Sequence, residues 1–465
     1  MHGSLPACLV LAFGLTSAAN AQSRQAKLDQ YLLARARLGQ FNGSVLVARQ
    51  GHVLLDKGYG LANVEHRVKA GPGTRYALAS LTKSFTDAAI FRLAEEGKLE
   101  TSDSLCHWIS SCPPAWVPVT LTQMMHHTSG IPDYEEPLDL GSEAYVDFMS
   151  QSHSAARIIT QARAKPLDFV PGTRFSYSNT AYILLGAVIE KASGVTYQQF
   201  LRERVLVPSG LRDMMFASST EIAPDLASGY HVIDADFATI QAGVRLDEHS
   251  LLKDAALPLD GPHADANLIG TAHDLWLWMQ ALSDSTAISG PSVREMLTPG
   301  LGGYGTGWFV DQRFGKRTAS HTGLLPGYAS TVEWYPDSRT AIILITNTTG
   351  VRLSVTLRDL AAILFDQPYD VPVARHLIDF DSSAARPLAG EYSLTDGGTA
   401  IVTLDKTMLL VQIPGRFTAG AFPVSANDYY APFFDNTVRF VRDSTGAGRR
   451  VALRINGATL SGVRK

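Results

Sequence analysis

Lys83 follows Ser80 by three positions in the segment YALASLTKSFTDAAIFRLAEEGKLE, residues 76–100. Three residues are almost one turn of an α-helix, so the hydroxyl and the ammonium share a face if a helix begins here. Serine is a weak nucleophile until a base removes its proton, and a neutral lysine can be that base. We therefore expect burial or nearby cations to lower the pKa of Lys83. The N-terminus of a helix also favours developing negative charge.

The same spacing recurs at Ser250 and Lys253, where acidic residues and proline crowd the segment and indicate an exposed loop. The spacing alone is therefore not diagnostic. Two further segments add chemistry: Tyr177-Ser178-Asn179, just before an apolar helical segment, and His321-Thr322-Gly323, within a strand pattern.

In this order and at this wide separation, Ser-x-x-Lys, Tyr-x-Asn and His-Thr-Gly resemble the motifs of the β-lactamase-related serine hydrolases. Tyr-x-Asn is the form of class C β-lactamases. His-Thr-Gly, in place of Lys-Thr-Gly, is similar to extracellular D-alanyl-D-alanine carboxypeptidases. The resemblance extends from about Phe41 to Phe365, including HHTSGIPDY and YGTGWFV. It implies a penicillin-binding-protein fold.

The resemblance also implies roles for individual residues. Those that would carry the chemistry are Ser80 as acylated nucleophile, Lys83 as its base and Tyr177 as proton relay to the leaving group and the deacylating water. Those that would bind substrate are Asn179 at its amide, His321 and Thr322 at its carboxylate, Gly323 against its backbone, and the N–H groups of Ser80 and Leu324 as an oxyanion hole.

The implied function is that of a serine hydrolase acting through an acyl-enzyme, without cofactor or metal. We expect a D-stereospecific peptidase or carboxypeptidase, or a small-ester hydrolase. The alternatives are a class C-like β-lactamase and a penicillin-binding sensor or scaffold that does not turn over. The expected partners are D-amino-acid peptides, esters or β-lactams. His321 replaces a lysine, which weakens the charge available to hold a carboxylate; Arg313, Lys316 and Arg317 are candidates to replace it.

The elements that must position these residues follow from hydrophobic periodicity. Residues 43–60 predict a hairpin, and strand patterns return at 307–323, 328–336 and 340–348. Helices are predicted from Ser80 to the stop at Gly97, over 180–194 and from Thr196, with Thr196 and Gln199 as a capping box, and over 271–282 and 354–367. This pattern predicts an α+β fold: one antiparallel sheet from distant parts of the chain, flanked by helices, with a helical lobe inserted.

After residue 385 short alternating runs predict a small antiparallel β-barrel, which resembles the lipocalin-like module often appended to this family. We predict a hydrolase domain over 22–380, a linker over Phe380–Pro387 and the β domain over 386–465. The apolar run ACLVLAFGL followed by ANA predicts a signal peptide over 1–21, hence a periplasmic or secreted protein. In that setting Cys106 and Cys112 are expected to form a disulfide, although two unpaired thiols are the alternative.

Composition excludes other classes of protein. The net charge of −4 and pI near 6.4 give no reason to expect nucleic acid, and no segment after the leader is long and apolar enough to span a membrane. Residues 300–305 match G-x-G-x-x-G without a preceding strand or following helix, so we expect a loop. His126-His127 lacks a third metal ligand and is interpreted as a structural turn.

Overall fold

The computed structural model describes residues 24–135, 151, 153–218, 220–232, 251–253, 264–431, 436–455 and 458–465. The predicted signal peptide and Ser250 lie outside these residues. The chain divides into two compact units. We call residues 42–231 with 253–349 the sheet unit, and residues 1–41, 232–252 and 350–465 the barrel unit. No helix among the described residues is long and apolar enough to cross a membrane.

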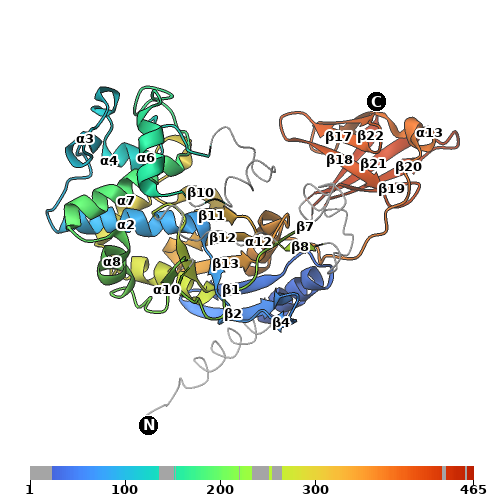
Figure 1. Ribbon diagram of the computed structural model, residues 1–465. Coiled ribbons are helices and arrows are strands. Elements are labelled where there is room, and N and C mark those ends of the chain that lie inside the picture. Colours follow the sequence, from blue (N-terminus) through green and yellow to red (C-terminus); the bar gives the residue numbers. More distant parts are fainter. Residues whose placement is uncertain are drawn as a thin grey trace, which may run out of the picture. The chain divides into compact units, whose positions relative to one another are not determined.

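The sheet unit contains a six-stranded sheet in the order β10-β11-β12-β13-β1-β2, in which all neighbours are antiparallel (Figure 1). Its strands are β1 (Gly43–Arg49), β2 (His52–Tyr59), β10 (Phe309–Arg313), β11 (Lys316–Leu325), β12 (Tyr328–Tyr335) and β13 (Thr340–Thr346). β1 pairs with β13 from Gly43 opposite Thr346 to Ala48 opposite Ala341. The predicted single sheet from distant segments is therefore confirmed.

The predicted hairpin between β1 and β2 turns at Gln50 and Gly51, which both have positive φ angles. This is the backbone geometry that tight hairpins require. Shorter strands lie outside the large sheet: β3 (Leu61–Asn63), β4 (Val68–Lys69), β5 (Tyr76–Ala77), β6 (Met215–Phe216), β7 (Tyr230–Val232), β8 (Leu251–Lys253), β9 (Leu268–Gly270) and β14 (Thr348–Thr349).

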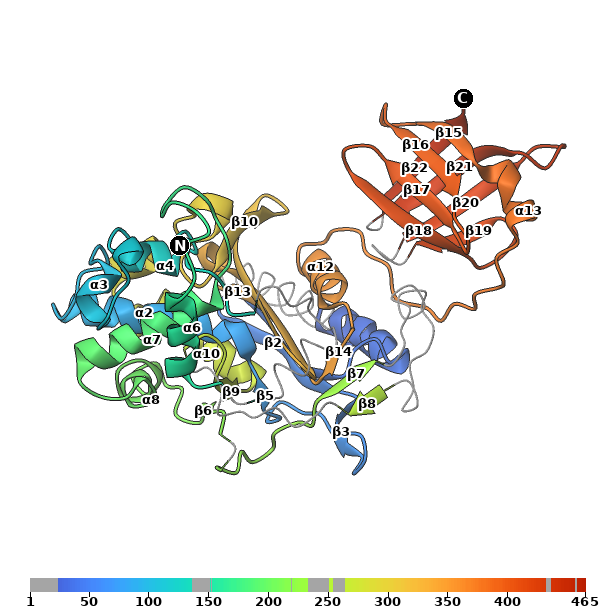
Figure 2. The same ribbon diagram turned by 45° about the horizontal axis from the view of Figure 1, so that its top comes forward.

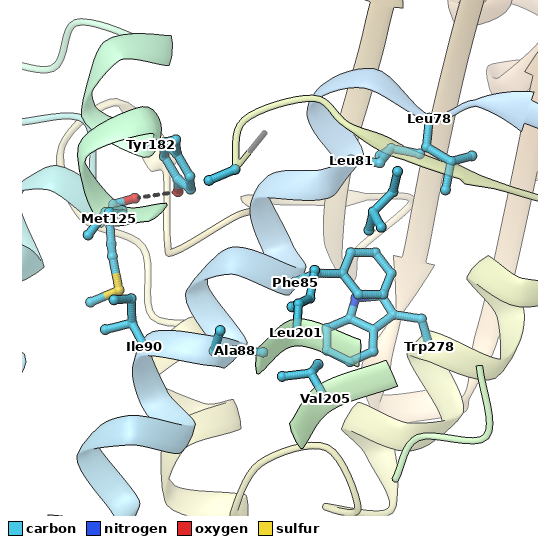
Figure 3. Packing of buried hydrophobic residues seen from close by; sticks show 14 of the residues in the cluster. Leu78, Leu81, Phe85, Ala88, Ile90, Met125, Tyr182, Leu201, Val205 and Trp278 are labelled. Atoms are coloured by element: carbon cyan, nitrogen blue, oxygen red, sulfur yellow. Dashed lines mark hydrogen bonds between the residues drawn. The ribbon is translucent and has the colours of Figure 1, made fainter. Parts of the chain in front are cut away.

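The sheet unit contains several helices, and α2 among them is largely buried. They are α2 (Thr82–Glu95), α3 (Leu105–Trp108), α4 (Leu121–Met125), α6 (Ala155–Arg163), α7 (Asn179–Ser193), α8 (Tyr197–Leu201), α10 (Ala272–Ser283) and α11 (Gly290–Met296). α10 packs against β1 and β13, and α2 packs against α7 and α8. Figure 3 shows α2 in this core, where Phe85 stacks on Trp278 with ring centroids 4.2 Å apart. Aromatic packing of this kind fixes α2 rigidly.

The predicted helix boundaries agree closely with the structure, with two differences. Ser80 lies in a 3₁₀ turn, Ala79–Leu81, and the α-helix begins at Thr82. Thr196 accepts from the Gln199 N–H, but the Gln199 side chain donates to Glu203, so only half of the predicted capping box forms.

The Cys106–Cys112 segment forms a closed loop that begins in α3. Ser104 caps this helix by accepting from the Cys106 N–H, and the two sulfurs are bonded to each other. The bond links two residues that are 6 positions apart in sequence and joins α3 to the loop that follows it.

The barrel unit combines helices with a closed barrel of eight antiparallel strands (Figure 2). A helix over residues 24–37 is linked to α12 (Leu353–Leu364) by the Tyr31 hydroxyl, which donates to Asp359 at 2.7 Å. The barrel strands are β15 (Gly390–Leu394), β16 (Thr399–Leu404), β17 (Leu409–Ile413), β18 (Phe417–Pro423), β19 (Asp428–Ala431), β20 (Asn436–Arg442), β21 (Gly448–Ile455) and β22 (Ala458–Arg464). The predicted β-barrel is therefore confirmed.

The barrel closes because β15 pairs with both β16 and β22. Alternate side chains fill its interior; on β17, Leu409, Val411 and Ile413 are buried. The predicted linker contains a short helix, α13 (Ser382–Ala385), and Ala385 is buried in the barrel core.

Candidate active site

Ser80 and Lys83 lie where β11 approaches the start of α2. The Lys83 Nζ atom donates to Ser80 Oγ at 3.1 Å. Lys83 is completely buried, whereas Ser80 is partly exposed. The residue before the serine, Ala79, has a φ of 52°, which is unusual for a residue with a side chain. A constrained turn therefore presents the serine hydroxyl above a buried amine.

Two fixed acceptors orient the Lys83 amine. Nζ donates to Asn179 Oδ1 at 2.7 Å and to the Asp265 carbonyl oxygen at 3.0 Å. An ammonium has three hydrogens, so Ser80 Oγ accepts the third. In a neutral amine the two fixed acceptors keep the two remaining hydrogens, and the lone pair then faces Ser80. The site is therefore preorganised for proton transfer from the serine.

Tyr177 lies beside this pair. Its ring centroid is 5.0 Å from Lys83 Nζ, and its phenol lies near both Ser80 and Lys83, which favour the phenolate form. Burial raises the pKa of Tyr177, and the Lys83 ammonium opposes that rise without cancelling it. The structure thus brings Ser80, Lys83, Tyr177 and Asn179 together from two distant segments, since Lys83 and Asn179 are 96 residues apart in sequence.

The expectation of a lowered lysine pKa is wrong. Burial by itself lowers the pKa of Lys83, but the charge of Tyr177 in its ionised form and those of Asp265 and Glu135 favour the ammonium, and the pKa lies above its ordinary value. We conclude that the resting pair is a lysine ammonium with a neutral tyrosine. The base forms only when this pair has lost one proton.

Asp133 is a site residue that the sequence reasoning missed. Its carboxylate accepts from both the backbone N–H and the side-chain amide of Asn179, each at 3.1 Å. Burial raises the pKa of Asp133 to about 6, and burial with Asp133 and Asp265 nearby raises the pKa of Glu135 to about 7. Asp133 fixes the amide orientation of Asn179, so that Oδ1 faces Lys83. Its position in the segment HHTSGIPDY, quoted for the resemblance, was the available signal.

His321 lies on β11 and is buried, and both ring nitrogens are engaged. Nδ1 lies 2.7 Å from the Thr322 carbonyl oxygen, and Nε2 lies 3.1 Å from the Tyr304 hydroxyl. A carbonyl only accepts, so Nδ1 carries the hydrogen and Nε2 accepts from Tyr304. Burial and the Lys83 charge lower the pKa of His321 to about 3. His321 is therefore neutral and has no hydrogen left for a substrate carboxylate.

Packing within the protein also requires a glycine at position 323. A Cβ at this position would lie 2.3 Å from the Leu78 carbonyl oxygen and 3.1 Å from Ala79 Cβ. The glycine lets β11 pack directly on the turn that holds Ser80. Thr322 and Leu324, on either side of it, are exposed. The oxyanion role of the Ser80 and Leu324 N–H groups stays a prediction.

The expected compensating cations do not act at His321. Arg313 donates to both carboxylate oxygens of Glu333, at 2.8 and 2.7 Å, and Arg317 pairs with Asp337 at 2.7 Å. Lys316 lies five residues before His321 on the same strand, or about 16 Å away at the usual rise of about 3.3 Å per residue. These three side chains therefore do not replace the positive charge that a lysine at position 321 would offer to a substrate carboxylate.

His127 was interpreted as part of a turn, but it also supports Tyr177. It has a φ of 55°, and its Nδ1 accepts from the Ser178 N–H at 3.0 Å. Its ring lies on that of Tyr177 with centroids 4.1 Å apart. Burial, Lys83 and His321 lower its pKa well below the usual range. A neutral His127 therefore fixes both the backbone and the ring of the Tyr-x-Asn motif.

The glycine-rich segment reaches this site through Tyr304, whose hydroxyl contacts His321. The glycine-rich segment forms a 3₁₀ turn, Leu301–Gly303. Lys253 forms an ion pair with Glu65 at 2.9 Å. Within the described parts of the chain, no group of three or more His, Cys, Asp or Glu residues is arranged to hold a metal ion.

Comparison with known proteins gives a consistent result. Residues 30–365 match the family described as Beta-lactamase. Penicillin-binding protein 4* of Bacillus subtilis (strain 168) is 30% identical over 419 residues, or 86% of this chain and 90% of that protein.

Two solved structures share the fold. The octameric penicillin-binding protein homologue from Pyrococcus abyssi has a TM-score of 0.64 at 24% identity, covering 94% of this chain and 99% of that one. D-amino acid amidase from Ochrobactrum anthropi SV3, complexed with L-phenylalanine amide, has a TM-score of 0.62 at 20% identity, covering 74% of this chain and 99% of that one.

Proposed function

Because the chain belongs to the β-lactamase family of serine hydrolases, we propose that it hydrolyses small esters and D-amino-acid amides or peptides through an acyl-enzyme on Ser80. The observation that carries this proposal is the 3.1 Å contact between Lys83 Nζ and Ser80 Oγ, with the amine held by Asn179 and Asp265. A scaffold that only binds ligands has no need of a serine and a buried lysine in this arrangement.

Acylation begins when the Lys83–Tyr177 pair has lost one proton. Ser80 Oγ attacks the substrate carbonyl as its proton passes to the Lys83 amine, and a C–O bond forms. The tetrahedral intermediate collapses and breaks the bond to the leaving group, which takes the proton from Lys83 through Tyr177. The backbone N–H groups of Ser80 and Leu324 are proposed to hold the oxyanion.

Deacylation reverses these proton movements. Water attacks the acyl carbonyl and gives its proton to the Lys83–Tyr177 pair. The bond from the carbonyl carbon to Ser80 Oγ then breaks, and the serine recovers its proton as the acid leaves. Each cycle thus consumes one water and returns the pair to its starting protonation state.

The environment of His321 supports substrates without a carboxylate beside the scissile bond. Its two nitrogens are occupied by Thr322 and Tyr304, and Arg313 and Arg317 are paired with carboxylates elsewhere. The negative groups near Lys83, among them Asp265 and Glu135, oppose a further carboxylate. An ester or amide lacks that charge, so we favour an esterase or amidase over a carboxypeptidase. The structural likeness to a D-amino acid amidase supports the same choice.

Class C-like β-lactam hydrolysis is the second candidate, and the presence of Tyr177 beside Lys83 favours it. Penicillins carry a carboxylate next to the reactive amide, so the argument from His321 predicts slow acylation.

One experiment tests the chemistry and the substrate together. A fluorophosphonate should form an adduct that mass spectrometry maps to the Ser80 peptide. The kcat/KM values are then compared for p-nitrophenyl butyrate, nitrocefin, a D-Ala-D-Ala peptide and the C-terminal amide of that peptide. We expect the ester and the amidated peptide to exceed the free acid and nitrocefin. Nitrocefin turnover near about 10⁶–10⁸ M⁻¹s⁻¹, with the others negligible, would identify a β-lactamase instead.

A further inference from the structure

A second ionisable group is buried on α2, one turn beyond Lys83. Asp87 is completely buried, and its Oδ2 lies 2.8 Å from the hydroxyl oxygen of Tyr182 on α7. Its Oδ1 has no hydrogen-bond partner among the residues that the structure describes. The three hydrogens of the Lys83 ammonium already have acceptors in Ser80, Asn179 and the Asp265 carbonyl. Asp87 therefore forms no ion pair with the lysine on its own helix.

Counting hydrogens around Tyr182 fixes the protonation state of Asp87. The Tyr182 oxygen lies 2.8 Å from Asp87 and 3.0 Å from the carbonyl oxygen of Met125, a contact drawn in Figure 3. A phenol has one hydrogen, and a carbonyl can only accept. Both contacts are hydrogen bonds only when Tyr182 donates to Met125 and a protonated Asp87 donates to Tyr182. An ionised Asp87 would leave one of these short oxygen–oxygen contacts without a hydrogen.

The ring that Asp87 holds supports the catalytic pair. Lys83 Nζ lies 5.4 Å from the centroid of the Tyr182 ring, and the same ring contacts His127, with centroids 5.1 Å apart. His127 in turn stacks on Tyr177. A displacement of Tyr182 would therefore disturb both the lysine and the tyrosine of the site.

We propose that Asp87 is a positioning residue that works as a neutral carboxylic acid: its proton fixes Tyr182 beneath Lys83 and Tyr177, and it adds no charge beside the lysine. This proposal rests on the acyl-enzyme function proposed for Ser80.

The groups that face Asp87 agree with a neutral acid. They are Lys83 on α2, Tyr182 on α7, Tyr197 on α8, and Tyr304. Burial raises the pKa of Asp87 well above its usual range, and this effect exceeds the opposing effects of Tyr182 and Lys83.

The competing explanation is that Asp87 is ionised and acts as a counter-ion of Lys83. The Asp87→Asn variant separates the two, because its side-chain amide can still donate to Tyr182 but cannot be charged. With a neutral acid, kcat/KM for p-nitrophenyl butyrate stays within about threefold of the wild-type value. The rising limb of its pH profile, which reports loss of the proton from the Lys83–Tyr177 pair, does not move. With a counter-ion, losing the charge lowers the lysine pKa and moves that limb to lower pH. Such a movement overturns the proposal.

Asp87→Leu is the matched variant, since it keeps the volume and removes the donor. We expect kcat to fall about tenfold or more while Asn restores it, and equal kcat in the two variants overturns the positioning role. Infrared spectra of the wild type provide a readout that requires no variant to fold. A protonated-carboxyl band should persist at about pH 9, above the pKa of Glu135, and its absence overturns the proposal. Fluorophosphonate labelling of wild-type Ser80 is measured in parallel. Its failure refutes the acyl-enzyme function and leaves the infrared result readable.

Discussion

The sheet unit and the eight-stranded barrel bury different kinds of group. The sheet unit encloses Lys83, Asp87, His127 and His321, each with a displaced pKa. The described residues of strands β15–β22 bury no charged side chain. Charges of the barrel lie outside, as in the partly exposed ion pair of Arg439 with Asp428. In the helices of the barrel unit, the buried Asp359 is paired with Arg35 and Arg358. Buried ionisable groups are costly for stability, so the cluster in the sheet unit indicates where the chemistry is.

The largest expected effect is that of Ser80→Ala. A small effect would contradict the assignment of the chemistry to the sheet unit. Without the nucleophile, kcat/KM for p-nitrophenyl butyrate should fall by about 10⁴-fold or more, since the base cannot act without it. Fluorophosphonate labelling should disappear. Circular dichroism should match the wild type, because Ser80 is partly exposed and fills no core space. Full activity in this variant would contradict the mechanism.

The pH dependence should be the next largest effect. The pKa values of Lys83 and Tyr177 are both raised, so at neutral pH most molecules have a lysine ammonium beside a neutral tyrosine. This pair must lose one proton before it can act as the base. The active form is the deprotonated one, and kcat/KM should therefore rise with pH, by up to about tenfold per unit, between about pH 7.5 and 9.5. This range lies above the pKa of about 7 for Glu135. A flat or falling profile there would contradict the assignment of the base.

His127→Leu should have a moderate effect. The substitution removes the acceptor for the Ser178 N–H and the ring beneath Tyr177. We expect kcat to fall about 10- to 100-fold with a smaller change in KM. His66→Leu, at an exposed histidine of the same unit, is the control. Equal kcat values in the two variants would show that His127 is only part of a turn.

Removal of the barrel should have a small effect on the chemistry. A chain ending at Asp381 retains every residue assigned to the site, so Ser80 should be labelled at a rate within about threefold of the full protein, with substrate range as the property open to change. A folded truncated chain that no longer reacts would show that the barrel helps to build the site.

The disulfide should matter least to activity. Replacing Cys106 and Cys112 together by serine should lower the free energy of unfolding by about 2 kcal/mol and leave labelling within about twofold. Titration of the denatured, unreduced mature protein should detect no free thiol. Two free thiols would remove the bridge and weaken the prediction of export.

The sequence predicted the outline of the fold because its patterns are local. The turn at Gln50-Gly51, the stop of α7 at Gly194 and the alternation in the barrel each depend on a few neighbouring residues. The segments that meet in the large sheet followed from β-rich runs at both ends of the region. The Ser-x-x-Lys motif is likewise local, because its two functional residues lie within one helical turn.

The missing parts of the site depend on contacts between distant segments. The role of Asp133 follows from its contact with Asn179, 46 residues away in sequence. The raised pKa of Lys83 results from charges contributed by several loops, which no spacing reveals. The occupied nitrogens of His321 depend on Tyr304, and the need for Gly323 depends on the backbone of Leu78. None of these contacts can be inferred from the sequence pattern around a single residue.

The pairing of β1 with β13 also sets the order in which this molecule can fold. β1 is synthesised about 300 residues before β13, one of its two neighbours in the sheet, and a separation of this size slows folding. Until β13 emerges, the edge of β1 that it will cover has no partner, and the buried side chains of β1 are open to association with other chains. We therefore expect the sheet unit to complete its folding only after β13 has been made.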